Sequence, residues 1–190
     1  LDLFDDHEEV VSEDGKKVTR KGIYLLPNLL TTASLFSGFF SIISAINGNF
    51  IASGMALFAA QMLDGLDGRV ARLTNSQSLF GAQYDSLCDV ISFGLAPAII
   101  VFLWGLDSMG QAGWVFSFLY VAAAALRLAR FNTYIGSEDT YFKGLPSPVA
   151  SGMVVYFVWA MSSYGIQGEE VGAILATFTA ILTGLVSLLM

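Results

Sequence analysis

The sequence has one cysteine and one histidine in 190 residues, and these shortages exclude several kinds of functional site. Cys88 has no second cysteine with which it could form an intrachain disulfide or a cysteine-rich zinc site. His7, the only histidine, lies in a run of acidic residues near the start of the chain. A catalytic system in which a histidine activates a serine or a cysteine is therefore excluded.

Charged residues are also scarce. They make up 13% of the chain, whereas soluble domains carry roughly 25%. The apolar residues come in blocks of about twenty, which is the length that a helix needs to cross a hydrocarbon core about 30 Å thick. The sequence thus predicts an all-α fold, a polytopic bundle of six transmembrane helices. The predicted spans are 25–47, 50–73, 79–104, 112–133, 147–165 and 171–190. We expect the tryptophans to anchor these helices at the membrane interface: Trp104, Trp114 and Trp159.

Acidic residues are concentrated at the start of the chain. Seven of the sixteen lie within the first fourteen positions, a distribution typical of a solvated tail. We predict that residues 1–21 form this acidic tail with a basic juxtamembrane segment, and that residues 22–190 form the transmembrane domain. The last apolar run stops at Met190 without a capping residue, so we expect the natural chain to continue.

Basic residues indicate how the bundle is oriented. If the N-terminus is cytoplasmic, all nine Lys and Arg residues fall on the cytoplasmic side, and the opposite loops carry only Asp107, Glu169 and Glu170 as charged groups. Cytoplasmic loops of membrane proteins are rich in Lys and Arg. The N-terminus is therefore predicted to be cytoplasmic, in the cell (cytoplasmic) membrane, with the active site facing the cytoplasm.

Four carboxylates interrupt two of the apolar segments: Asp64 and Asp67 in the second, Asp85 and Asp89 in the third. A charged side chain near the bilayer centre costs at least about 2.5–3.5 kcal/mol, so such residues usually mark a functional cavity. Spacings of three and four residues place each pair on one face of its helix, and the short polar loop 74–78 allows the two faces to converge. At about 1.5 Å per residue, Asp64 and Asp89 each lie roughly 15 Å from that loop.

Four converging carboxylates repel one another unless a cation neutralises them. Oxygen ligands favour Mg²⁺, Mn²⁺ or Ca²⁺ over zinc or copper. A structural network of ion pairs is one alternative, but only Arg69 and Arg72 are near in sequence, too few for four acids. A divalent-cation channel or transporter is another alternative, although its acids would line a path rather than lie at one depth.

The acids belong to a longer pattern, Asp64-x2-Asp67-Gly68-x2-Ala71-Arg72-x8-Gly81-x3-Asp85-x3-Asp89. This pattern resembles the signature of the CDP-alcohol phosphotransferase family at every fixed position. The resemblance implies transfer of a phosphatidyl group from a CDP-linked lipid to an alcohol. It also implies that two divalent ions, Mg²⁺ or Mn²⁺, are held by Asp64, Asp67 and Asp85, with Asp89 as a neighbouring ligand and as the general base.

The same resemblance implies residues that bind the donor. Arg72 is expected to bind pyrophosphate oxygens through its forked guanidinium. Gly68 and Gly81 lack a Cβ and would let the backbone approach the nucleotide closely. The other expected contacts to cytidine or phosphate are Asn28, Thr31 and Ser78. For these three, an ordinary position at a helix start or interface is an equal alternative.

Two later motifs bear on the acceptor. Arg127-x-Ala129-Arg130-Phe131-Asn132 and Phe142-x-Gly144-Leu145-Pro146-x-Pro148 resemble motifs of the membrane-integrated phosphatidylserine synthases of that family. The resemblance implies CDP-diacylglycerol and L-serine as substrates. Membrane lipids and a second copy of the chain, in a homodimer, are the other expected partners, and nucleic acid is not.

The expected serine contacts are Arg127, Arg130 and Asn132. Two arginines one turn apart could receive a carboxylate, but they could also be the ordinary basic flank of a membrane helix. Glycerol 3-phosphate or an inositol phosphate is an alternative acceptor, although a phosphate would need more cationic groups than the sequence offers here.

Overall fold

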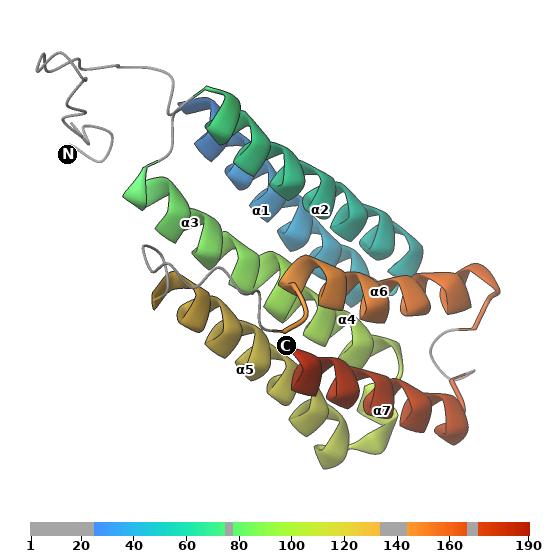
Figure 1. The fold of residues 1–190 in the computed structure, drawn as a ribbon. Coiled ribbons are helices and arrows are strands. Elements are labelled where there is room, and N and C mark those ends of the chain that lie inside the picture. Colours follow the sequence, from blue (N-terminus) through green and yellow to red (C-terminus); the bar gives the residue numbers. More distant parts are fainter. Residues whose placement is uncertain (1–24, 75–77, 134–143, 167–170) are drawn as a thin grey trace, which may run out of the picture.

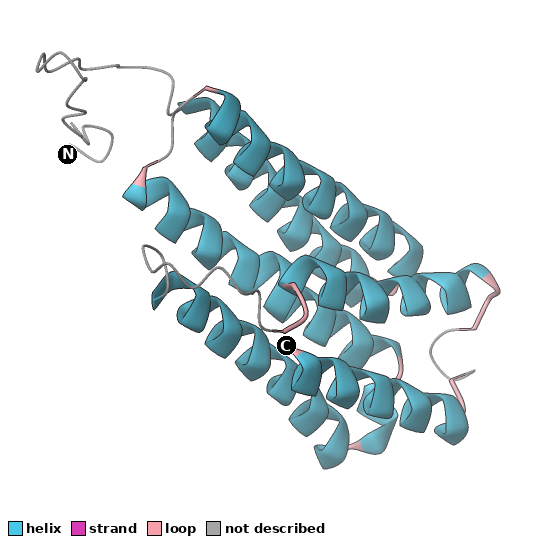
Figure 2. Ribbon diagram, in the orientation of Figure 1, coloured by secondary structure: helices cyan, strands magenta, loops and turns pink. Residues whose placement is uncertain are grey.

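The structure is a computed structural model that describes residues 25–74, 78–133, 144–166 and 171–190. The described residues fold into helices and short turns, without a strand among them (Figures 1 and 2). In chain order the α-helices are α1 (Leu25–Ile46), α2 (Phe50–Leu73), α3 (Leu79–Asp89), α4 (Ala96–Trp104), α5 (Gln111–Thr133), α6 (Ser147–Ser163) and α7 (Ala173–Leu189). A π-helical segment, η1 (Val90–Leu95), joins α3 to α4, and a 3₁₀ turn, η2 (Leu106–Met109), follows α4. The predicted tail 1–21, Phe142, Lys143, Glu169 and Glu170 lie outside the described residues.

The helices coincide with the six predicted apolar segments to within two residues at each end, with α3, η1 and α4 together forming the third segment. Three helical stretches of the described chain are long and apolar enough to cross a membrane: Leu26–Ile46, Phe80–Trp104 and Gln111–Asn132. Helix α2 is long enough but carries four charged residues, and α6 and α7 have 17 residues each. The all-α prediction is confirmed, whereas six membrane crossings and their direction stay predictions.

Large apolar side chains cover much of the outer surface of the bundle. Phe36 of α1 is 67% exposed, Leu126 of α5 is 71% exposed and Ile174 of α7 is 89% exposed. Water would make so much exposed apolar surface costly, whereas lipid chains would not. These outward apolar faces indicate an integral membrane protein.

Helices α1 and α2 form an antiparallel hairpin that is held by serine hydroxyls. Ser41 Oγ donates to the carbonyl of Ser53 at 2.7 Å, and Ser53 Oγ donates back to the carbonyl of Ser41 at 2.8 Å. Nearer the loop 74–78, Ser34 Oγ donates to the carbonyl of Ala60 at 2.9 Å. Small hydroxyl residues let membrane helices approach closely and bond across the contact. The start of α1 is therefore held against the second half of α2.

The third predicted segment is not a uniform α-helix, because η1 interrupts it directly after Asp89. Pro97 has no N–H to donate to the carbonyl of Phe93, its partner in a regular α-helix. The buried hydroxyl of Tyr120 on α5 donates to that carbonyl instead, at 3.2 Å. The Gly38 backbone packs against this segment, where an added Cβ would lie 2.5 Å from Ser92 Oγ. The π-helix is thus supported from α5 and α1.

Helix α4 contributes much of the hydrophobic core, and Trp104 is part of it. Trp104 is fully buried, and its Nε1 donates to the carbonyl of Ile166 at 3.1 Å. The expectation that Trp104 is a lipid-facing interface anchor was wrong, because the indole fills the space between α4 and the end of α6. Trp114, in contrast, is 56% exposed on α5.

One end of the bundle collects the polar parts of the sequence. Figure 1 shows the start of α1, the end of α2, the start of α3 and the end of α5 at the same end. Four arginines lie on these stretches of α2 and α5: Arg69, Arg72, Arg127 and Arg130. The predicted substrate-binding residues of these helices are therefore within one region of the fold.

Candidate active site

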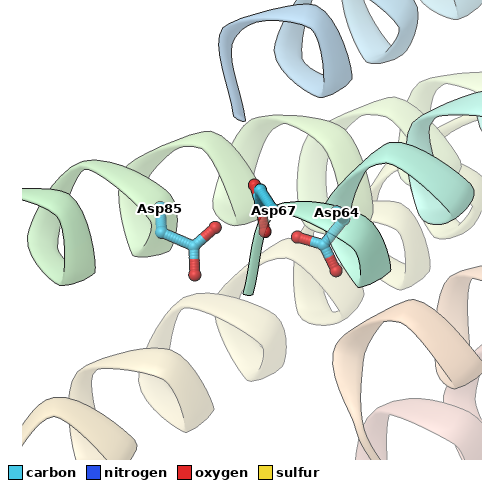
Figure 3. A group of neighbouring side chains, drawn as sticks. All are labelled: Asp64, Asp67 and Asp85. Carbon is cyan, nitrogen blue, oxygen red and sulfur yellow. The ribbon is translucent and has the colours of Figure 1, made fainter. Parts of the chain in front are cut away.

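Three of the four predicted acids converge between α2 and α3. Asp64, Asp67 and Asp85 each bring one carboxylate oxygen to within 4.8 Å of the others. Figure 3 shows the three carboxylates next to one another, two on α2 and one on α3. Asp67 is buried and the other two are partly buried. The spacing argument therefore anticipated the correct faces of both helices.

Asp89 lies one turn further along α3 and is not one of the three converging ligands. Its carboxyl lies close enough to that of Asp64 for the two to interact. Arg127 of α5 is also near enough for its charge to interact with Asp89. Asp89 is thus next to the aspartate cluster and faces α5, and its roles as ligand and as general base stay predictions.

The three carboxylates suit a divalent cation. Asp85 Oδ1 is buried and has no hydrogen-bond partner among the described residues. Arg69 and Arg72 are both exposed, and Arg72 Nε donates to the carbonyl of Gly68 in its own helix at 3.1 Å. Three close, partly desolvated carboxylates with an unsatisfied oxygen form the oxygen-only donor set that Mg²⁺ and Mn²⁺ prefer. The predicted identity, Mg²⁺ or Mn²⁺, and the predicted number, two ions, stay predictions.

Thr31 approaches the cluster from α1. Its hydroxyl, on a residue that is 5% exposed, donates to Asp67 Oδ2 at 2.6 Å and lies 3.1 Å from the carbonyl of Pro27. Groups that hold a metal ligand from outside usually fix its orientation. The structure thus gives Thr31 a contact with Asp67, while its predicted contact with the CDP-lipid stays a prediction.

Other predicted donor contacts surround the start of α3. Ser78 accepts a hydrogen bond from the Gly81 N–H at 2.9 Å and so caps α3. A Cβ on Gly81 would lie 3.1 Å from Ser78 Oγ and 3.4 Å from Asn28 Oδ1, so these three residues meet. A Cβ on Gly68 would have no atom within 4 Å, so open space lies beside the α2 backbone there. Asn28, Ser78 and Gly81 are thus brought together, while Gly68 borders open space.

The end of α5 is held by residues that sequence reasoning missed. Arg127 Nη1 donates to Ser147 Oγ, at the start of α6, at 2.7 Å. Ser86 of α3 donates to Asn132 Oδ1 at 3.0 Å. Ser86 follows Asp85 directly and Ser147 lies between the two prolines of the later motif, positions that would have been the only signals in the sequence. Arg130, the third predicted serine contact, is exposed on α5.

Most of the chain is similar to a known family of proteins. A profile of the CDP-alcohol phosphatidyltransferase family matches residues 24–186, which include every described helix from its first turn to nearly the end of α7. The chain belongs to this family. The aspartate cluster suits the divalent-metal site typical of this family of transferases.

Individual relatives carry more specific names. The chain is 45% identical over 143 residues to a CDP-diacylglycerol–serine O-phosphatidyltransferase of Helicobacter pylori, which covers 75% of this chain and 60% of that protein. It is 36% identical over 159 residues to the enzyme of that name in Mycobacterium tuberculosis, covering 80% of this chain and 55% of that protein. An archaetidylserine synthase of Methanothermobacter thermautotrophicus is 39% identical over 144 residues, covering 75% of this chain and 60% of that protein. The chain thus spans little more than half the length of these relatives.

Proposed function

We propose that this chain transfers the phosphatidyl group of CDP-diacylglycerol to the hydroxyl of L-serine, giving phosphatidylserine and CMP. The observation that carries the proposal is the convergence of Asp64, Asp67 and Asp85 within 4.8 Å, from residues of the family signature. The names of the relatives support serine, since the bacterial and archaeal proteins differ in their lipid name and share serine.

In this proposal the aspartates hold one or two divalent ions, Mg²⁺ or Mn²⁺. Such ions supply charge neutralisation at the phosphoryl oxygens and at the departing CMP. Asp67 is held in orientation by Thr31, and Asp85 offers its unsatisfied Oδ1. Asp89 takes the proton of the serine hydroxyl, whose oxygen forms the new bond to the β-phosphorus while the bond to CMP breaks. The remaining catalytic effect comes from positioning the two substrates.

The donor is bound beside α2 and the start of α3. Arg72 uses Nε for the carbonyl of Gly68, and we propose that its two terminal nitrogens bind pyrophosphate oxygens. The open space at Gly68 admits the phosphates. The cytidine side is contacted by Asn28 of α1 together with Ser78 and Gly81 at the start of α3.

The acceptor is bound toward α5. We propose that Arg127, Arg130 and Asn132 bind serine, with an arginine on its carboxylate. The contact between Ser86 and Asn132 brings the end of α5 to the α3 face that carries Asp85 and Asp89. A phosphate-bearing acceptor, such as glycerol 3-phosphate, would add negative charge beside the aspartates.

A panel of acceptors tests the proposal. Purified protein in lipid or detergent receives CDP-diacylglycerol, Mn²⁺ or Mg²⁺, and serine, glycerol 3-phosphate or an inositol phosphate in turn, and CMP and the lipid product are measured. We expect metal-dependent CMP release and phosphatidylserine with serine only, and neither with the Asp89→Asn protein. CMP release with another alcohol and not with serine would refute serine as the acceptor. Metal transport by the protein without CMP release would refute the assignment of the chain as an enzyme.

A further inference from the structure

A polar cluster joins α2 to the start of α6, one helical turn from Asp64. Gln61 lies three residues before Asp64 on α2 and is partly buried. Its Nε2 donates to the carbonyl of Pro148 at 2.7 Å and to Ser151 Oγ at 3.0 Å. Its Oε1 accepts a hydrogen bond from the hydroxyl of Tyr156. One side chain of α2 therefore binds three positions of α6.

The hydrogen-bond partners of the Gln61 amide determine its orientation and show which of its hydrogens are used. A backbone carbonyl can only accept, so the nitrogen of the amide must face Pro148. Both amide hydrogens are then used, one by Pro148 and one by Ser151. Gly152 makes the close approach possible, because a Cβ there would lie 3.3 Å from Nε2 and 3.1 Å from a ring carbon of Tyr156. Gln61 therefore has no N–H to offer a substrate and acts on α6 alone.

The start of α6 is in turn connected to α5. Ser147, which precedes Pro148, is fully buried and accepts the hydrogen bond from Arg127 Nη1 at 2.7 Å. Pro146 and Pro148 fix the backbone torsion φ on both sides of Ser147. A shift of the Pro148 carbonyl would therefore move the Ser147 hydroxyl with it, and the Arg127 guanidinium would lose or follow its partner.

We propose that Gln61 is a positioning residue for the acceptor alcohol. Gln61 holds the start of α6 against α2 and thereby, through Ser147, sets the position of Arg127. This inference rests on the proposed function, in which Arg127 binds the acceptor carboxylate. Helix α2 would then locate both substrates, the donor through Asp64, Asp67 and Arg72 and the acceptor through Gln61. Misplacing a reacting group by about 1 Å is enough to slow a reaction that depends on orientation.

The experiment measures KM for each substrate on four variants. Gln61→Leu removes all three hydrogen bonds at nearly constant size, Ser147→Ala removes one hydrogen-bond partner of Arg127, and the third variant combines them. Ser53→Ala is the matched control. It also removes buried hydrogen bonds of α2, those to Ser41 of α1, but nearer the turn between α1 and α2. We expect Gln61→Leu to raise KM for serine about tenfold, a change of about 1.4 kcal/mol, and to leave KM for CDP-diacylglycerol and Mn²⁺ within about twofold.

The effect of the double variant on KM for serine distinguishes positioning of Arg127 from a general loss of helix packing. If Gln61 acts through Ser147, the double variant should raise KM for serine little more than Gln61→Leu alone. An equal rise in KM for both substrates, a multiplicative effect in the double variant, or the same serine effect in Ser53→Ala would overturn the proposal. If Gln61→Leu does not accumulate, Ser151→Ala replaces it. We then expect KM for serine to rise about threefold, because one of the three hydrogen bonds of Gln61 is lost, and an unchanged serine KM would refute the proposal. The assay of the parent protein alone tests whether serine is the acceptor. Failure of the proposed function is therefore distinguished from failure of the proposal on Gln61.

Discussion

Removing the Thr31 hydroxyl should weaken metal binding more than it weakens donor binding. The change is Thr31→Val, which keeps the shape of a buried side chain that is 5% exposed. The lost bond is 2.6 Å long and runs to a carboxylate, Asp67. A hydrogen bond to a charged group contributes about 1.5–3 kcal/mol. If Asp67 binds the ion in the orientation that Thr31 holds, the Mn²⁺ concentration for half-maximal activity should rise about 10- to 100-fold.

The assay titrates CMP release with Mn²⁺ at saturating CDP-diacylglycerol, and a second titration follows the metal-induced rise in thermal midpoint without substrate. Thr31→Ser keeps the hydroxyl and should stay within a few-fold of the parent protein. Thr32→Val, on the exposed neighbour that pairs with Tyr84, controls for loss of a hydroxyl on α1. An unchanged metal titration together with a raised KM for CDP-diacylglycerol would refute the reasoning, and would instead support Thr31 as a direct contact of the donor lipid.

Three further changes give distinct outcomes. Asp67→Ala should reduce CMP release to below a few per cent at saturating Mn²⁺ while circular dichroism stays helical, because one of three converging ligands is lost. Arg72→Lys should raise KM for CDP-diacylglycerol with serine KM unchanged, since a point charge cannot replace two terminal nitrogens; equal donor kinetics would remove Arg72 from the donor site. Gly38→Ala should lower the thermal midpoint in detergent, because its Cβ would lie 2.5 Å from Ser92 Oγ, and such overpacking costs about 1–3 kcal/mol. An unchanged midpoint would show that α1 and η1 can separate freely.

Much of the fold was predictable because the length of an apolar run is a local property of the sequence. The predicted segments 50–73 and 79–104 have the observed ends of α2 and of the stretch from α3 to α4. The π-helix inside the latter was not predictable. It depends on Tyr120, from a helix more than twenty residues away, reaching the carbonyl of Phe93. The burial of Trp104 was missed for a similar reason, since composition cannot distinguish a tryptophan facing lipid from one facing the end of α6.

The candidate site also has a part that the sequence predicts and a part that it does not. Helical spacing alone was enough to bring Asp64, Asp67 and Asp85 to one place, because each pair lies within one helix and a short loop joins the two. The contacts of Gln61 with α6 and of Thr31 with Asp67 join residues 87 and 36 positions apart. Gln61 was visible only as one more polar residue in an apolar helix, a turn before the first aspartate, and nothing local indicated its partner.

The π-helix η1 lets its helix hold one extra residue without changing the phase between its two halves. A single π turn contains one residue more than regular α-helix of the same extent. Deleting one residue from Val90–Leu95 would therefore restore α geometry and leave the following residues close to their present orientation relative to Asp85 and Asp89. Deleting one residue between Ala96 and Leu103 instead would rotate Trp104, which is fully buried, by about 100° and turn it out of the core. An alignment gap of one residue within η1 would thus signal loss of the π turn with the aspartates and the core of α4 still in register.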